Sequence, residues 1–160
     1  MTWVTKSHSV PFAVNFTQES MKILGVKLCK MLTFKDHILG QLKKAYTKSA
    51  ALRCIRHFVP AEVIISIYNS FVLPHLEYCS PLLLGVGKVQ ASRLKDADFY
   101  ILRSILGYGK TISHQELLGI VNMKTLEHRR LCSLLLLLYK SLFCNGPSYI
   151  RDFFSFKDSA

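Results

Sequence analysis

The chain has 160 residues, which is the length of one compact domain, and half of them are hydrophobic, which excludes a mainly disordered chain. Lysine and arginine number 21 against 10 acidic residues, so the formal net charge is +11. Residues 1–60 hold 10 basic and 2 acidic side chains, a local charge of +8, and residues 61–160 hold 11 and 8, a charge of +3. This balance favours an anionic partner such as nucleic acid, an acidic protein or a membrane surface.

The cysteines and the apolar runs indicate a cellular location. Five cysteines without a C-x-x-C pair are an unusual set for a disulfide framework, so we expect a reducing compartment. The first residues lack the charged-then-apolar order of a signal peptide. The most apolar run, residues 131–138, is shorter than the roughly 20 residues that a bilayer span needs. We therefore expect an intracellular protein, cytoplasmic or nuclear, with no membrane partner.

The first 32 residues predict a polar lead-in and a β-hairpin. Apolar residues alternate through 10–16, the period of a strand, and Pro11 predicts that this strand lies at an edge. Residues 17–20 favour a turn. Leu24, Val26 and Leu28 share one face of a predicted second strand, in which Gly25 marks a kink or a close approach.

Residues 33–160 have helical periodicity throughout. Thr33 and Asp36 resemble a capping box that opens the first helix, and Ser113 with Glu116 forms a better one further along. Gly107 is placed to end a long helix. The predicted helices cover residues 33–55, 60–71, 88–106, 113–118 and 125–143, with an apolar stretch kinked or broken by Pro74 and Pro81 that ends near Gly85. The expected fold is mainly α, with five to six helices and a small N-terminal β-hairpin.

The sequence offers no set of residues that we expect to catalyse a reaction. Asp96 and Asp98 form the closest carboxylate pair, but at i and i+2 of a helix they diverge, so we expect two solvated charges. The six histidines show no metal-ligand spacing, and the glycines around Lys88 lack the full phosphate-loop pattern. We predict no catalytic residue, no metal site and no cofactor in this chain.

Binding of phosphates is the better-supported chemistry. Lys22, Lys27, Lys30 and Lys35 flank the predicted hairpin, and Lys43, Lys44 and Lys48 lie on the first long helix. Such a cluster neutralises phosphates without reading bases. The alternative is a solvated face that keeps an apolar protein soluble. Arg129 and Arg130 have the same two interpretations, as phosphate contacts or as partners of Glu127 and nearby aspartates.

Several segments, taken together and in order, resemble the reverse transcriptases of non-LTR retrotransposons of the jockey-like LINE group. The similarity extends over roughly residues 21–152 and is strongest at 68–79. The matching stretches are 24–26 (LGV), 32–38 (LTFKDHI), 68–79 (YNSFVLPHLEYC), 94–107 (LKDADFYILRSILG), 126–130 (LEHRR), 139–140 (YK) and 146–147 (GP).

The resemblance implies the region just C-terminal to the polymerase palm. Residues 1–32 would then be the end of a primer-grip-like hairpin, and residues 33–160 a helical thumb-like domain that holds the template–primer duplex by its backbone. The palm with its aspartate motif is absent from this chain. Pro81 to Leu84 stand where family members usually carry a Trp, and Asp98 stands where they carry a Gln.

The sequence thus predicts a fragment of an RNA-directed DNA polymerase that does not polymerise alone and that binds an RNA–DNA or other template–primer duplex. The predicted phosphate contacts are Lys27, Lys30, Lys35, Lys43, Lys44 and Lys48. The alternatives are an α-helical protein-interaction module, in which the apolar segments 64–71 and 131–143 contact a missing palm or a second copy, and a non-functional transposon relic.

Overall fold

The computed structural model describes residues 4–5, 20–144 and 146–155. Within these residues the chain is mainly helical, with a two-stranded antiparallel hairpin near the N-terminus, so the predicted fold class is confirmed. The described part holds seven α-helical segments, against the five to six predicted, because short turns before and after the long helices form segments of their own. No helix among the described residues is long and apolar enough to cross a membrane.

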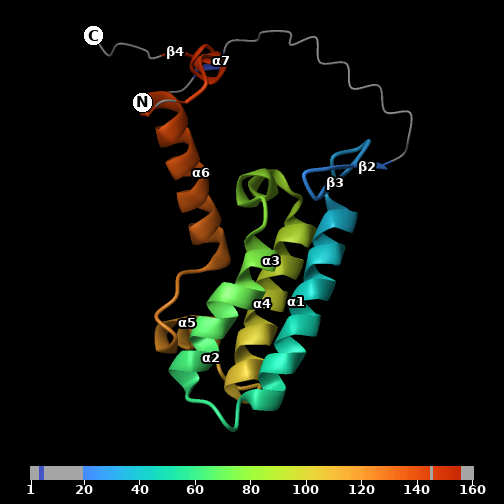
Figure 1. Cartoon of the computed structure of the whole chain (residues 1–160), viewed down its shortest axis with the longest axis vertical. Coiled ribbons are helices and arrows are strands. Elements are labelled where there is room, and N and C mark those ends of the chain that lie inside the picture. Colours follow the sequence, from blue (N-terminus) through green and yellow to red (C-terminus); the bar gives the residue numbers. More distant parts are fainter. Residues whose placement is uncertain (1–3, 6–19, 145, 156–160) are drawn as a thin grey trace.

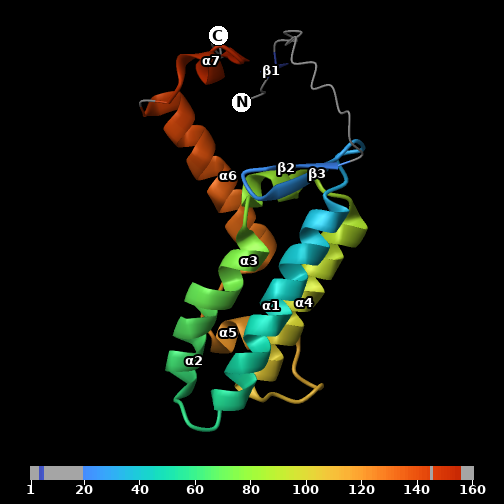
Figure 2. The same cartoon turned by 45° about the vertical axis from the view of Figure 1, so that its right-hand side comes forward.

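Three helical segments form most of the core. α1 (Lys35–Ile55) and α4 (Lys88–Leu106) run side by side in the same direction, and the segment that contains α2 (Ala61–Ile67) and α3 (Leu73–Glu77) runs back in the opposite direction alongside this pair (Figures 1 and 2). Their apolar faces bury a single cluster of side chains, to which α5 (His114–Ile120) also contributes. Ile38 and Leu42 of α1 are in this cluster.

The returning segment bends where the sequence predicts a kink. A π-helical turn, Tyr68–Val72, joins α2 to α3, and Pro74 lies in the first turn of α3. Proline lacks the N–H that a continuous helix needs, and the wider turn accommodates this. A 3₁₀ segment, Ser80–Gly85, follows after Cys79 reverses the chain with a φ of 56°.

The hairpin lies further along the chain than predicted. β2 (Ser20–Ile23) pairs with β3 (Val26–Cys29), and the connecting turn is Leu24-Gly25. The predicted unbroken strand over 24–28 is therefore wrong, because both turn residues adopt positive φ and reverse the chain in two residues. Of the turn predicted at 17–20, Ser20 lies in β2, and residues 17–19 lie outside the described residues. The predicted strand at 10–16 lies outside the described residues.

Of three predicted helix ends, two are confirmed and one is wrong. Gly107 ends α4 with a φ of 78°, and Ser113 and Glu116 form the predicted reciprocal capping box. The capping box at Thr33 is wrong: Phe34, with a φ of 52°, precedes α1, and no side chain caps this end. The Thr33 hydroxyl lies 3.2 Å from the sulfur of Cys29 instead.

Asp98 is also not the solvated charge that the sequence predicts. Its side chain is 2% exposed and accepts a hydrogen bond from the Tyr68 hydroxyl. Burial raises the pKa of Asp98, and the Tyr68 hydrogen bond opposes part of that rise. Asp96 remains exposed, next to Ser92. The apolar segment 64–71 likewise differs from a docking patch, because Ile64 and Tyr68 are buried in the core while Phe71 is exposed.

α6 (Leu126–Phe143) begins in the core and then extends away from it, followed by α7 (Ser148–Arg151) (Figures 1 and 2). The Arg129 guanidinium pairs with the Glu77 carboxylate at 2.8 Å. The buried Arg130 guanidinium donates to the carbonyl of Leu76 at 3.2 Å. Both arginines thus contact α3, and the predicted partners at Glu127 and nearby aspartates are not the ones found. β1 (Val4–Thr5) pairs with β4 (Phe154–Ser155).

Candidate nucleic-acid interface

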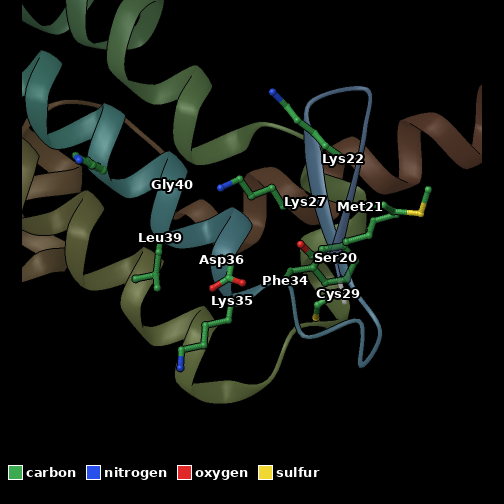
Figure 3. A pocket seen from close by; sticks show the side chains of 12 residues that line it. Ser20, Met21, Lys22, Lys27, Cys29, Phe34, Lys35, Asp36, Leu39 and Gly40 are labelled. Atoms are coloured by element: carbon green, nitrogen blue, oxygen red, sulfur yellow. The ribbon is translucent and has the colours of Figure 1, made fainter. Parts of the chain in front are cut away.

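Two hollows lie where the hairpin meets the N-terminal part of α1. The first, which we call the hairpin cleft, has a volume of about 650 Å³ and is lined by β2, β3 and the first turns of α1 (Figure 3). The second, which we call the imidazole pocket, has a volume of about 490 Å³ and also reaches α3. Lys22, Lys27, Asp36 and Gly40 line both, so the two hollows form one continuous basic surface.

The hairpin register places two lysines directly opposite each other. Lys22 pairs with Lys27 across the strands, and both side chains are exposed. Like charges in directly opposed cross-strand positions are destabilising, and an anion bound between them removes that cost. Figure 3 shows both side chains on the hairpin beside the start of α1.

The helix contributes two further rows of side chains. Lys35, Leu39 and Lys43 follow one another at four-residue spacing along α1 and line the hairpin cleft. Lys44 lies on the neighbouring row and lines the imidazole pocket. Gly40 lies one turn before Lys44 on that same row, and a Cβ added there would meet no atom within 4 Å. The floor of the surface is therefore open.

The six predicted phosphate contacts are divided among different places. Lys27, Lys35 and Lys43 line the hairpin cleft, and Lys27 and Lys44 line the imidazole pocket. Lys30 is exposed after β3 but lines neither hollow, and the ammonium of Lys48 lies 4.1 Å from the ring centroid of Phe71. Lys22, although noted with the cluster, is missing from the predicted contacts. Its pairing with Lys27 depends on the turn at Leu24-Gly25, which the sequence pattern does not predict.

Both ends of the hairpin are fixed by hydrogen bonds. At the tip, the Tyr78 hydroxyl donates to the carbonyl of Leu24, and a Cβ on Gly25 would lie 3.1 Å from that hydroxyl. Gly25 also has a φ of 84°, so the tip requires glycine for two reasons. At the other end, the Thr33 backbone N–H donates to the sulfur of Cys29, and the Thr33 hydrogen bonds lower the pKa of this thiol. The lysines are therefore presented on an anchored hairpin.

Two histidines lie in the imidazole pocket. His37 is 3% exposed, and among the described residues its Nε2 has no hydrogen-bond partner. His75 Nδ1 lies 3.3 Å from the side-chain oxygen of Gln41. Burial lowers the pKa of both imidazoles, with further lowering by Lys44 and Lys27 at His37 and by Lys48 and Lys44 at His75. These surroundings therefore favour the neutral form of both rings.

The described residues contain no group of three or more His, Cys, Asp or Glu side chains that could hold a metal ion. In the comparisons with known proteins, no family model matches the chain, and neither a curated protein nor a solved structure matches it. The resemblance to non-LTR reverse transcriptases therefore rests on the sequence motifs alone.

Proposed function

We propose that this chain binds nucleic acid by its phosphate backbone, and that it derives from the thumb region of a non-LTR retrotransposon reverse transcriptase. One observation carries the proposal. The five lysines Lys22, Lys27, Lys35, Lys43 and Lys44 line two adjoining hollows, and Asp36 is the single carboxylate among the described residues that line them. The concentration of positive charge on a concave surface attracts a polyanion.

The side chains favour backbone contact over base reading. Specific base contacts are made mostly by bidentate arginine, asparagine or glutamine side chains. The described residues that line the two hollows include no arginine or asparagine, and the glutamine among them, Gln41, has its side-chain oxygen 3.3 Å from His75 Nδ1. Lysine is a point charge on a flexible stem, which suits phosphates in any sequence. We therefore expect little difference in affinity between unrelated sequences.

The proposed origin gains support from how the matching motifs pack. The motif at 68–79 supplies Tyr68 and Glu77, and the motif at 94–107 supplies Asp98. Tyr68 bonds to Asp98, and Glu77 pairs with Arg129 of the motif at 126–130. Motifs distant in sequence thus interact, through a buried hydrogen bond and a partly exposed ion pair, as parts of one inherited fold would.

Neutralising two of the lysines tests the proposed interface. Replacing Lys43 and Lys44 by glutamine removes two phosphate contacts, so the slope of log affinity against log salt should flatten by about two. Fluorescence anisotropy with a labelled RNA–DNA duplex measures this slope. The matched control replaces Arg53, in the last turn of α1, and Lys110, which follows α4, by glutamine. These residues lie toward the other end of the bundle, so the control should keep the original slope. Equal slopes in both variants would remove Lys43 and Lys44 from the interface.

The exposed apolar face of α6 favours a second candidate function, which is self-association. Cys132, Leu135, Leu136 and Tyr139 share one face by their spacing, and all four are exposed. Leu135 is 55% and Tyr139 57% exposed, and α6 has no charged residue between Arg130 and Lys140. A neutral apolar face on a projecting helix is typical of a protein contact.

A further inference from the structure

We propose that the imidazole pocket binds a phosphomonoester, the terminal phosphate of a nucleic-acid strand, between Lys27, Lys44 and His37. The nucleic-acid part of this inference rests on the proposed function, whereas the phosphate site itself does not. It differs from backbone binding because a strand end carries a group that the interior of the strand lacks.

The pocket is large enough for a nucleotide end. Its volume of about 490 Å³ lies within the range of small-ligand sites, which is roughly 300–1,000 Å³. Three elements form its walls: the hairpin with Lys27, α1 with Lys44, and α3 with His75. A site built from three elements can surround a phosphate, whereas a flat row of lysines contacts it from one side only.

The unpaired nitrogen is the feature that distinguishes this pocket from the rest of the basic surface. His37 is only 3% exposed, and its Nε2 has no hydrogen-bond partner in the described part of the chain. A buried polar atom without a partner costs about 1–3 kcal/mol, so such atoms mark places where a partner binds. A protonated imidazole donates from Nε2, and a phosphate oxygen is a suitable acceptor.

The charges around His37 are strongly unbalanced. The groups that face it from the packed elements are Lys44 and Asp36 on α1, Lys22 and Lys27 on the hairpin, and His75 and Tyr78 on and after α3. Three ammonium groups oppose one carboxylate. A phosphomonoester carries about −1.5 to −2 charges at pH 7, against −1 for a backbone phosphodiester, so it matches this surplus more closely.

Binding of the dianion should also bring a proton into the pocket. Without an anion, burial and the lysines keep the pKa of His37 below its usual value. A bound dianion offsets the lysines and favours the imidazolium form, which then donates to it. The affinity for a terminal phosphate should therefore rise as the pH falls from 8 toward 6.5. Below about pH 6 the phosphate itself gains a proton and the gain is lost.

The experiment compares two short RNA–DNA duplexes that differ in a single group, a 5′-phosphate or a 5′-hydroxyl. Fluorescence anisotropy with the whole chain at pH 7 should give about tenfold tighter binding of the phosphorylated duplex, as expected for one charge-assisted hydrogen bond with ionic support. The preference should increase between pH 8 and pH 6.5.

Adjacent lysines on α1 provide the matched variants. Lys44→Gln removes a cation from the imidazole pocket, so the preference for the 5′-phosphate should fall to about twofold or less. Lys43→Gln removes the same charge from the hairpin cleft only and should weaken both duplexes while keeping the preference. An equal preference in both variants, or no preference in the unmodified chain, overturns the assignment of the pocket.

A second measurement separates this inference from the proposed function. NMR titration with inorganic phosphate, or with a nucleoside 5′-monophosphate, follows the ring protons of His37 and His75 directly. Shifts at both rings that Lys44→Gln abolishes would support the phosphate site even if no duplex binds, in which case the proposed function fails alone. If inorganic phosphate binds but the 5′-phosphate gives no duplex preference, the strand-end ligand is overturned. Unchanged rings, with duplex binding intact, would overturn the site and keep the proposed function.

Discussion

The hairpin end and α6 differ in chemistry although they are fixed to the same short stretch of chain. The hairpin end presents lysines around open hollows, and α6 presents exposed leucines and a tyrosine without a charge. Tyr78 bonds to Leu24 of the hairpin, while the preceding residues, Glu77 and Leu76, contact the two arginines of α6. Three consecutive residues at the end of α3 therefore anchor both regions.

The hairpin end is suited to a polyanion, and the exposed face of α6 is suited to an apolar partner. The two surfaces share an anchor but no lining residue, so each can be altered without touching the other. If the chain has both functions, changes on one surface should leave the other function intact.

Removal of the Asp98 carboxylate should have the largest effect, because it weakens the core that supports both regions. Asp98→Ala leaves the buried Tyr68 hydroxyl without its acceptor, and we expect a loss of about 2–3 kcal/mol in the free energy of unfolding. Urea denaturation followed by circular dichroism measures it. A loss below 0.5 kcal/mol, as at a typical surface site, would contradict the role of this pair.

The pH dependence of stability gives the matched control at this position. The pKa of Asp98 is raised in the folded state, so the folded chain binds a proton more tightly than the unfolded chain does. This contribution is present below the usual aspartate pKa and is lost as the pH rises through the raised value. Asp98→Asn should remove that part of the pH dependence. An unchanged pH profile would show that Asp98 titrates normally.

Substitutions at Tyr78 and Glu77 should separate the two regions. Tyr78→Phe removes the hydrogen bond to Leu24 and should speed amide exchange in β2 and β3, at a cost of about 1 kcal/mol. Glu77→Gln breaks the partly exposed ion pair with Arg129 and should speed exchange at the start of α6, at a cost of up to about 1 kcal/mol. Hydrogen exchange read by NMR compares them. Faster exchange in both regions for either variant would show that they open together.

The smallest effect on stability is expected on α6. Leu135→Glu with Tyr139→Glu changes exposed positions, so the free energy of unfolding should change by about 0.5 kcal/mol or less per site. Light scattering at several concentrations should show loss of any self-association of the unmodified chain, with duplex affinity preserved. Lys124→Glu, at an exposed position before α6, is the control. Oligomers that persist in the double variant would exclude this face as the contact.

The sequence predicts the features of this fold that depend on neighbouring residues. The Ser113–Glu116 capping box and the end of α4 at Gly107 involve contacts within four residues, and both are found. The predicted capping box at Thr33 is wrong because the Thr33 hydroxyl is hydrogen-bonded to the sulfur of Cys29, in the preceding strand, and does not cap α1. Asp98 was misread because its partner, Tyr68, is 30 residues away, a separation that helical periodicity does not report.

In the candidate site, too, the sequence predicts what depends on neighbouring residues and misses what depends on contacts distant in sequence. Lys35, Lys43 and Lys44 were predicted from their helical spacing, and they line the two hollows. Lys22 and His37 were missed as parts of the site. The register of Lys22 depends on a turn in which Leu24 has a positive φ, a conformation that leucine rarely adopts. His37 belongs to the pocket only because Tyr78 holds the hairpin over α1.

The salt dependence of duplex binding tests the central claim most directly. The whole chain should bind RNA–DNA duplexes of unrelated sequence with similar affinity, and log affinity should fall linearly with log salt. A slope of about −4 is expected if the five lysines of the two hollows each neutralise one phosphate. Affinity that does not change with salt, or no binding at low salt, would contradict the account and leave α6 as the surface that acts.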